Sequence, residues 1–280
     1  MTERELNIAM RDGTAQAFLY CPDEAKDYPG ILCLTDLFGI RPANQAMAKR
    51  LAAKGYAVLM PNVFYRYAKI PLLDFEFVMG EERSMKVMGE LFQAVTARQM
   101  GPDGAAYADF LLAQAHVRGP RIGVVGYCFT GAMALRTAAQ IPDKIAAMAA
   151  FHGGRLVTDD ADSPHLLLPN VKARLYFGHA AEDSSMTADN IKTLEAALAA
   201  WGERRGAEES HAGGKVPTRQ YENAGGNFGL AGGKVPTRQY ESETYQGVRH
   251  GWTLPGRPIY DEAQAEVAFG KLTALMQETL

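Results

Sequence analysis

The chain has 280 residues, of which 47% are hydrophobic and 22% charged, and its formal net charge at pH 7 is −3. This balance lacks the basic footprint of proteins that bind nucleic acids or anionic membranes. No apolar run approaches the roughly 20 residues of a transmembrane helix, and residues 1–10 lack the apolar stretch of a signal peptide. We therefore expect a soluble cytoplasmic protein.

Hydrophobic periodicity and breaker residues predict alternating strands and helices over most of the chain. In chain order the elements are a strand at 16–20, a strand at 31–35, a helix at 41–55, a strand at 56–61, helices at 82–99 and 103–116, a strand at 121–126, a helix at 129–140, strands within 144–154 and 173–183, a helix at 187–201, a strand within 241–252 and a helix from about 260 to the C-terminus.

This alternation indicates an α/β fold, in which a mainly parallel sheet carries helices on both faces. No Pro/Ser-rich linker divides the chain, so we expect a single domain over residues 1–280. One segment breaks the rhythm: "AGGKVPTRQYE" occurs at 212–222 and again at 231–241. Its glycines and few bulky apolar residues predict a surface insertion at about 203–240, and its spacing does not match a phosphate-binding P-loop.

Three cysteines, Cys21, Cys33 and Cys128, are too few for a disulfide framework, and none form a C-x-x-C pair. The sequence also lacks H-E-x-x-H and any His/Cys cluster with zinc spacing. We therefore expect no metal and no cofactor. Cys21 and Cys33 are interpreted as packing residues.

The stretch "GVVGYCFTGA" has the pattern of a strand that enters a sharp turn and then a helix, the nucleophile elbow. Cys128 occupies the turn, and Gly126 and Gly131 remove side chains where strand and helix approach each other. The N-terminal amides of the following helix carry partial positive charge, which stabilises a thiolate and an oxyanion. Thr130 replaces the glycine that is usual at the fifth position. The alternative is a small buried cysteine without chemistry.

An acid and a histidine follow Cys128 in the order nucleophile, acid, histidine, which is typical of α/β-hydrolases. Asp183 comes just after the strand "ARLYFG", and His250 comes just after the strand "SETYQGV". Both positions are at the carboxyl ends of strands, where ligand sites of open α/β sheets form. We interpret Cys128, Asp183 and His250 as a catalytic triad, with Glu182 as an alternative acid.

At these residues the chain resembles the dienelactone hydrolase family, a cysteine-using branch of the α/β-hydrolases. The resemblance extends from about residue 14 to 275 and rests on "LTDLFGI", "GVVGYCFTGA", "FGHAAED" and "GVRHGW". It implies that Cys128 is the nucleophile, His250 the base and Asp183 the residue that orients His250. It further implies an oxyanion hole made of the backbone amides of Leu37 and Phe129.

The resemblance also suggests which residues surround the substrate. Asp36 stands where the family has a glutamate that touches the resting thiol, and it is one methylene shorter. Arg83 loosely matches one of two arginines that bind a substrate carboxylate, whereas Leu254 occupies the place of the other. The remaining predicted pocket residues are Phe38, His152 and Trp252, for each of which a structural role is the alternative.

The expected activity is cysteine-dependent hydrolysis of small activated esters or lactones through a thioester. The alternative is a binding or scaffold protein that keeps the fold, because Asp36, Thr130 and the insertion before His250 depart from the family pattern. The predicted partner is a small-molecule substrate, and the sequence leaves a monomer and a homodimer equally open.

Overall fold

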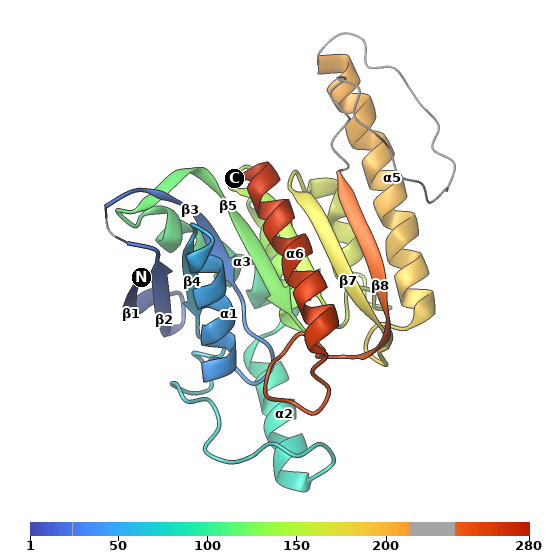
Figure 1. Cartoon of the computed structure of the whole chain (residues 1–280). Helices are drawn as coiled ribbons and strands as arrows, with labels where there is room; N and C mark the ends of the chain where they lie inside the picture. The colour runs from blue at the N-terminus through green and yellow to red at the C-terminus, as the bar shows by residue number, and fades with distance from the viewer. Residues whose placement is uncertain (24, 213–238) are drawn as a thin grey trace.

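One eight-stranded sheet forms the centre of the computed structural model, which describes residues 1–23, 25–212 and 239–280 (Figure 1). Its strand order is β1-β2-β4-β3-β5-β6-β7-β8. The pairs β1/β2 and β2/β4 are antiparallel, and the other neighbouring strands are parallel. The strands are β1 (Thr2–Met10), β2 (Gly13–Cys21), β3 (Tyr28–Cys33), β4 (Ala57–Pro61), β5 (Val117–Tyr127), β6 (Ile145–Phe151), β7 (Arg174–Glu182) and β8 (Tyr240–Arg249).

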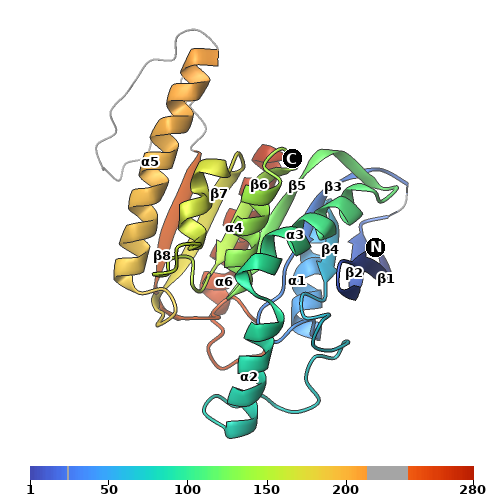
Figure 2. The same ribbon diagram turned by 180° about the vertical axis from the view of Figure 1, so that it is seen from behind.

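Helices cover both faces of the sheet, as Figures 1 and 2 show from opposite sides. Helices α1 and α6 pack on one face, and α3, α4 and α5 pack on the other; α2 stands at the end of the sheet where the parallel strands finish. Two buried apolar clusters fill these two interfaces. The helices are α1 (Pro42–Ala53), α2 (Glu82–Ala94), α3 (Ala97–Leu112), α4 (Thr130–Gln140), α5 (Ala188–Ala212) and α6 (Glu262–Thr279).

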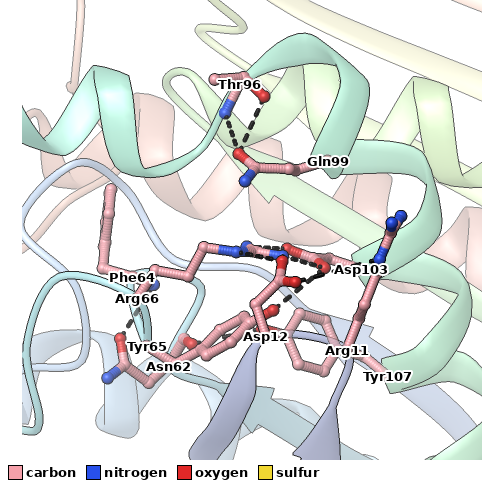
Figure 3. A network of polar contacts seen from close by, with 10 residues as sticks. All are labelled: Arg11, Asp12, Asn62, Phe64, Tyr65, Arg66, Thr96, Gln99, Asp103 and Tyr107. Carbon is pink, nitrogen blue, oxygen red and sulfur yellow. Dashed lines mark hydrogen bonds and ion pairs between the residues drawn. The ribbon is translucent and has the colours of Figure 1, made fainter.

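The structure differs from the expected elements at three places. Strand β1 was not predicted, although its alternating burial is the period-two pattern of an edge strand. The two predicted helices at 82–99 and 103–116 are divided instead at residues 95–96. There Thr96 and Gln99 form the capping box at the start of α3, in which the Thr96 amide donates to Gln99 Oε1 at 2.8 Å; the Thr96 hydroxyl also donates to this oxygen at 2.8 Å (Figure 3).

The third difference concerns the predicted insertion at 203–240. Helix α5 continues to Ala212, so residues 203–212 are helical rather than part of a loop. The rest of the insertion, 213–238, lies outside the described residues, and both copies of the repeated segment fall mainly within it. No helix in the described ranges is long and apolar enough to cross a membrane.

A buried ion-pair network joins the β1–β2 turn, the loop after β4 and helix α3 (Figure 3). Arg66 Nη1 and Nη2 donate to the two carboxylate oxygens of Asp103 at 2.5 and 2.9 Å, and Nη2 and Nε also donate to Asp12. The side chains of Arg66 and Asp103 are only 13% and 5% exposed. The Arg66 guanidinium is thus the cation paired with the buried Asp103 side chain.

We predict that Arg66→Ala lowers the free energy of unfolding by about 3 kcal/mol, because it leaves the buried Asp103 carboxylate without its cation. Arg83→Ala is the matched control, because Arg83 pairs with Asp74 on the surface, with side chains 63% and 84% exposed. Its loss should be within about 0.5 kcal/mol. Urea unfolding of both variants measures the difference. Equal losses would contradict the network's importance.

Candidate active site

Cys128 lies in the turn between β5 and α4 with a φ of +58°, a left-handed conformation that is strained for a residue with a side chain. The turn leaves no room at its glycines. A Cβ on Gly126 would lie 2.2 Å from the carbonyl oxygen of Thr130, and one on Gly131 would lie 2.8 Å from Gly153 Cα. These distances explain why the sequence has glycine at both positions.

Thr130 fits the elbow although the usual pattern has glycine there. Its buried hydroxyl accepts a hydrogen bond from the Tyr127 amide and donates one to the Tyr127 carbonyl, both at 2.9 Å. The side chain therefore folds back into the turn. This contact closes the end of β5 onto the first residue of α4.

His250 and Asp183 lie together at the ends of β8 and β7. His250 Nδ1 is 2.6 Å from Asp183 Oδ2, and the Asp183 side chain is only 2% exposed. The amide and hydroxyl of Ser185 donate to Asp183 Oδ1 at 2.8 and 2.7 Å. The alternative acid, Glu182, instead pairs with Arg249 at the surface, so it is not the partner of His250.

The interactions of His250 and Asp183 shift the pKa values of both side chains. Burial alone would lower the pKa of His250, but hydrogen bonds to Asp183 and Cys128 and the charges of both groups raise it to about 10. Burial likewise opposes ionisation of Asp183, yet its contacts with His250 and Ser185 bring the pKa of that carboxyl below its usual value. The arrangement favours an imidazolium beside the ionised Asp183 carboxylate.

The two backbone amides that were expected to form an oxyanion hole belong to Leu37 and Phe129. Phe129 immediately precedes α4, and Leu37 lies in the loop after β3. Within the described residues, neither amide donates to another backbone or side-chain group. Both residues are almost fully buried. Because buried N–H groups are usually hydrogen-bonded, these two amides can donate to the oxygen of a ligand or of water.

Asp36 and Arg83 have other partners than the expected ones. Asp36 is fully buried; its Oδ2 accepts from Arg41 at 2.5 Å and its Oδ1 accepts from the Phe38 amide at 2.9 Å. Since both oxygens are engaged, the short side chain serves the loop after β3 rather than the thiol. Arg83 pairs with exposed Asp74, which places it on the surface of α2 instead of in the pocket.

Arg257, which sequence reasoning missed, lies near the thiol. Burial lowers the pKa of its guanidinium, the neighbouring Arg41 lowers it further, and the charges of Asp36 and Cys128 oppose this shift. Its guanidinium lies 4.2 Å from the centre of the Phe38 ring, which is partly buried. Arg257 is seven residues after His250 rather than four, and no local pattern points to it.

His152 and Trp252 are buried behind the thiol rather than exposed to a pocket, since both are 0% exposed. Their rings meet edge to face with centroids 5.2 Å apart, and the His152 ring meets that of His250 in the same way at 5.0 Å. His179 is also buried and stacks on Phe177. The prediction that His152 and Trp252 line the pocket is therefore corrected.

A cavity of about 270 Å³ lies beside the elbow. Its lining includes the apolar residues Phe92, Val95, Met100, Phe129 and Ala132, together with Arg136 of α4 and charged residues of the loop after β6. Among the described residues, no group of three or more His, Cys, Asp or Glu side chains is placed to hold a metal ion.

Comparisons with known proteins agree with this architecture. The model of the dienelactone hydrolase family matches residues 15–205. A carboxymethylenebutenolidase of Rhodococcus opacus is 29% identical over 216 residues, which cover 75% of this chain and 74% of that protein. A carboxymethylenebutenolidase-like protein of Methylorubrum extorquens is 27% identical over 157 residues, 56% of this chain but only 50% of that protein.

A solved structure gives the same result for the fold. The dienelactone hydrolase-like promiscuous phosphotriesterase P91, from metagenomic libraries, superposes with a TM-score of 0.69 at 19% identity, over 99% of this chain and 98% of that one. The sheet order, the elbow and the family match point to one conclusion. The chain belongs to the dienelactone hydrolase family and is a hydrolase with the α/β-hydrolase fold.

Proposed function

We propose that this hydrolase cleaves small activated esters or lactones through a thioester on Cys128. The observation that carries the proposal is the continuous contact from Asp183 through His250 to Cys128. An imidazole held in this way favours ionisation of the neighbouring thiol, which is the nucleophilic form.

In the first half-reaction, Cys128 Sγ attacks the substrate carbonyl carbon as a thiolate. The carbonyl oxygen becomes an oxyanion that accepts hydrogen bonds from the amides of Leu37 and Phe129, each worth about 3 kcal/mol in related sites. The carbon–oxygen bond to the leaving group then breaks, and His250 gives the departing oxygen its proton. The product of this step is a thioester.

In the second half-reaction, neutral His250 takes a proton from a water molecule, whose oxygen attacks the thioester carbonyl. The carbon–sulfur bond breaks, the carboxylic acid leaves, and Cys128 regains the thiolate beside the imidazolium. A thiolate is itself a good leaving group, so the site suits substrates whose own leaving group is good. Simple amides are therefore poor substrates.

We further propose that the preferred substrates carry a carboxylate, which Arg257 binds. Arg41 is already neutralised by Asp36, whereas Arg257 forms no ion pair with a carboxylate in the described parts of the chain. A partly buried guanidinium without a counter-ion is a suitable partner for an anionic substrate group. The cavity of about 270 Å³ next to Phe129, lined by both apolar and charged residues, would hold a compact substrate group.

We predict that Cys128→Ala lowers kcat for 4-nitrophenyl acetate by roughly a thousand-fold or more, because the thioester can no longer form. Intact-protein mass spectrometry of the wild type, quenched during turnover, should show one acetyl group on Cys128. Cys33→Ala is the matched control, because that thiol is fully buried. Unchanged turnover in Cys128→Ala would contradict the mechanism, and an inactive wild type would favour a scaffold protein.

A second prediction concerns Arg257→Gln. Loss of a charge-assisted hydrogen bond worth about 1.5–3 kcal/mol should lower kcat/KM for the 4-nitrophenyl monoester of succinate by roughly 10- to 100-fold. The neutral 4-nitrophenyl acetate should change by less than about threefold. Arg83→Gln, at the exposed pair with Asp74, is the control and should affect neither ester. Equal losses on both esters would exclude carboxylate recognition by Arg257.

A further inference from the structure

His152 makes a hydrogen bond on each side of its ring. Its Nδ1 accepts from the backbone amide of Cys128 at 3.1 Å, an amide that also donates to the Phe151 carbonyl at 3.1 Å, and its Nε2 lies 2.8 Å from Thr253 Oγ1. The first partner is the proposed nucleophile itself. The second lies in the loop that begins at His250 and returns to α6. One side chain thus connects the two segments that must meet for catalysis.

The hydrogen bonds determine which nitrogen of His152 carries the proton. A backbone amide can only donate, so Nδ1 is unprotonated, and Nε2 carries the hydrogen that is donated to Thr253. Burial lowers the pKa of His152 well below its ordinary value, and the charge of His250 acts in the same direction. His152 is therefore neutral, and the nitrogen that faces the Cys128 amide carries no proton.

The backbone at both ends of the Cys128 contact is strained. The φ angles of Cys128 and His152 are +58° and +39°, although neither residue is glycine. Such conformations are strained and persist only when the surrounding structure holds them. The Cys128 carbonyl accepts from the Gly154 amide at 3.1 Å, and the His152 amide donates to the Gly178 carbonyl at 2.7 Å. The loop after β6 thus fixes the elbow and is itself fixed to β7.

We propose that His152 is a positioning residue that connects the nucleophile turn to the His250 loop and thereby sets the contact between Cys128 and His250. The inference rests on the proposed function for its catalytic readout. The edge-to-face contact of the two histidine rings, with centroids 5.0 Å apart, adds a direct support for the His250 ring. A glycine would accept the backbone angle of residue 152 without strain, but it would lose all these contacts.

The test begins with Thr253→Val, which keeps the size of the side chain and removes only the hydroxyl. Misalignment of Cys128 and His250 should lower kcat for 4-nitrophenyl acetate by roughly 10- to 100-fold, while KM changes by less than about threefold. The matched control is Thr253→Ser, which restores the hydroxyl and should recover most of kcat. Unfolding in urea confirms that each variant is folded.

A double-mutant cycle with His152→Leu separates positioning from general stability. If both residues act through one connection, Thr253→Val should have little further effect on kcat once His152 is replaced. The shape of the pH–rate profile should be the same in every variant, because His152 carries no proton in the reaction. The proposal would be overturned if Thr253→Val kept a kcat within threefold of wild type. It would also be overturned if the effects of the two substitutions on kcat were additive, or if a limb of the pH–rate profile were lost.

The rate of Cys128 alkylation by iodoacetamide gives a readout that does not require turnover. Cys21 and Cys33 are buried, so the reaction reports on Cys128. Thr253→Val should slow alkylation several-fold relative to wild type and to Thr253→Ser. If the wild type hydrolyses no ester, the proposed function fails while this measurement still tests the connection. If the wild type is active but alkylation and kcat are unchanged in Thr253→Val, only the connection fails.

Discussion

The hydrogen-bonded contact from Asp183 through His250 to Cys128 is the interaction on which the rest of the site depends. The three residues come from the ends of β7, β8 and β5, and the parallel register of the sheet brings those ends to one edge. Asp183 is buried and has its second oxygen occupied by Ser185. It therefore holds His250 in one orientation, and the raised pKa of His250 follows from its interactions with Asp183 and Cys128.

The elbow is maintained by packing at several points rather than by one strong contact. Gly126 and Gly131 permit a close approach that any Cβ would prevent. Thr130 closes the turn onto Tyr127, and His152 holds the Cys128 amide from the neighbouring strand end. The strained backbone at Cys128 is thus a local cost that the surrounding fold offsets. Such strain places the sulfur clear of the sheet, where a substrate can reach it.

The local pattern of apolar and turn-forming residues was sufficient to predict the alternation of strands and helices and the elements that carry Cys128, Asp183 and His250. The strand ends could be located because buried parallel strands have a distinct apolar pattern. The contact between Asp183 and His250 agrees with the chain order that suggested a triad. Even the missed strand β1 has a readable alternation, in which Leu6 and Ile8 face inward.

The remaining features depend on contacts between distant segments, which one sequence does not reveal. Arg257 approaches the thiol only because the loop after β8 folds over Phe38. Asp36 turns to Arg41 because its side chain is short and a cation lies five residues away. The two hydrogen bonds of His152 join residues 24 and 101 positions apart. Charge neutralisation and buried hydrogen bonds, rather than periodicity, decide these arrangements.

The most direct test of the central contact is a pH titration of His250, monitored by NMR in protein that is isotopically labelled at histidine. In the wild type, the imidazolium of His250 should persist until the pH approaches about 10. In Cys128→Ala its pKa should be lower, because one negative partner and one hydrogen bond are lost. Titration of His250 near its ordinary pKa in the wild type, or the same pKa in both proteins, would contradict the interaction of His250 with Asp183 and Cys128.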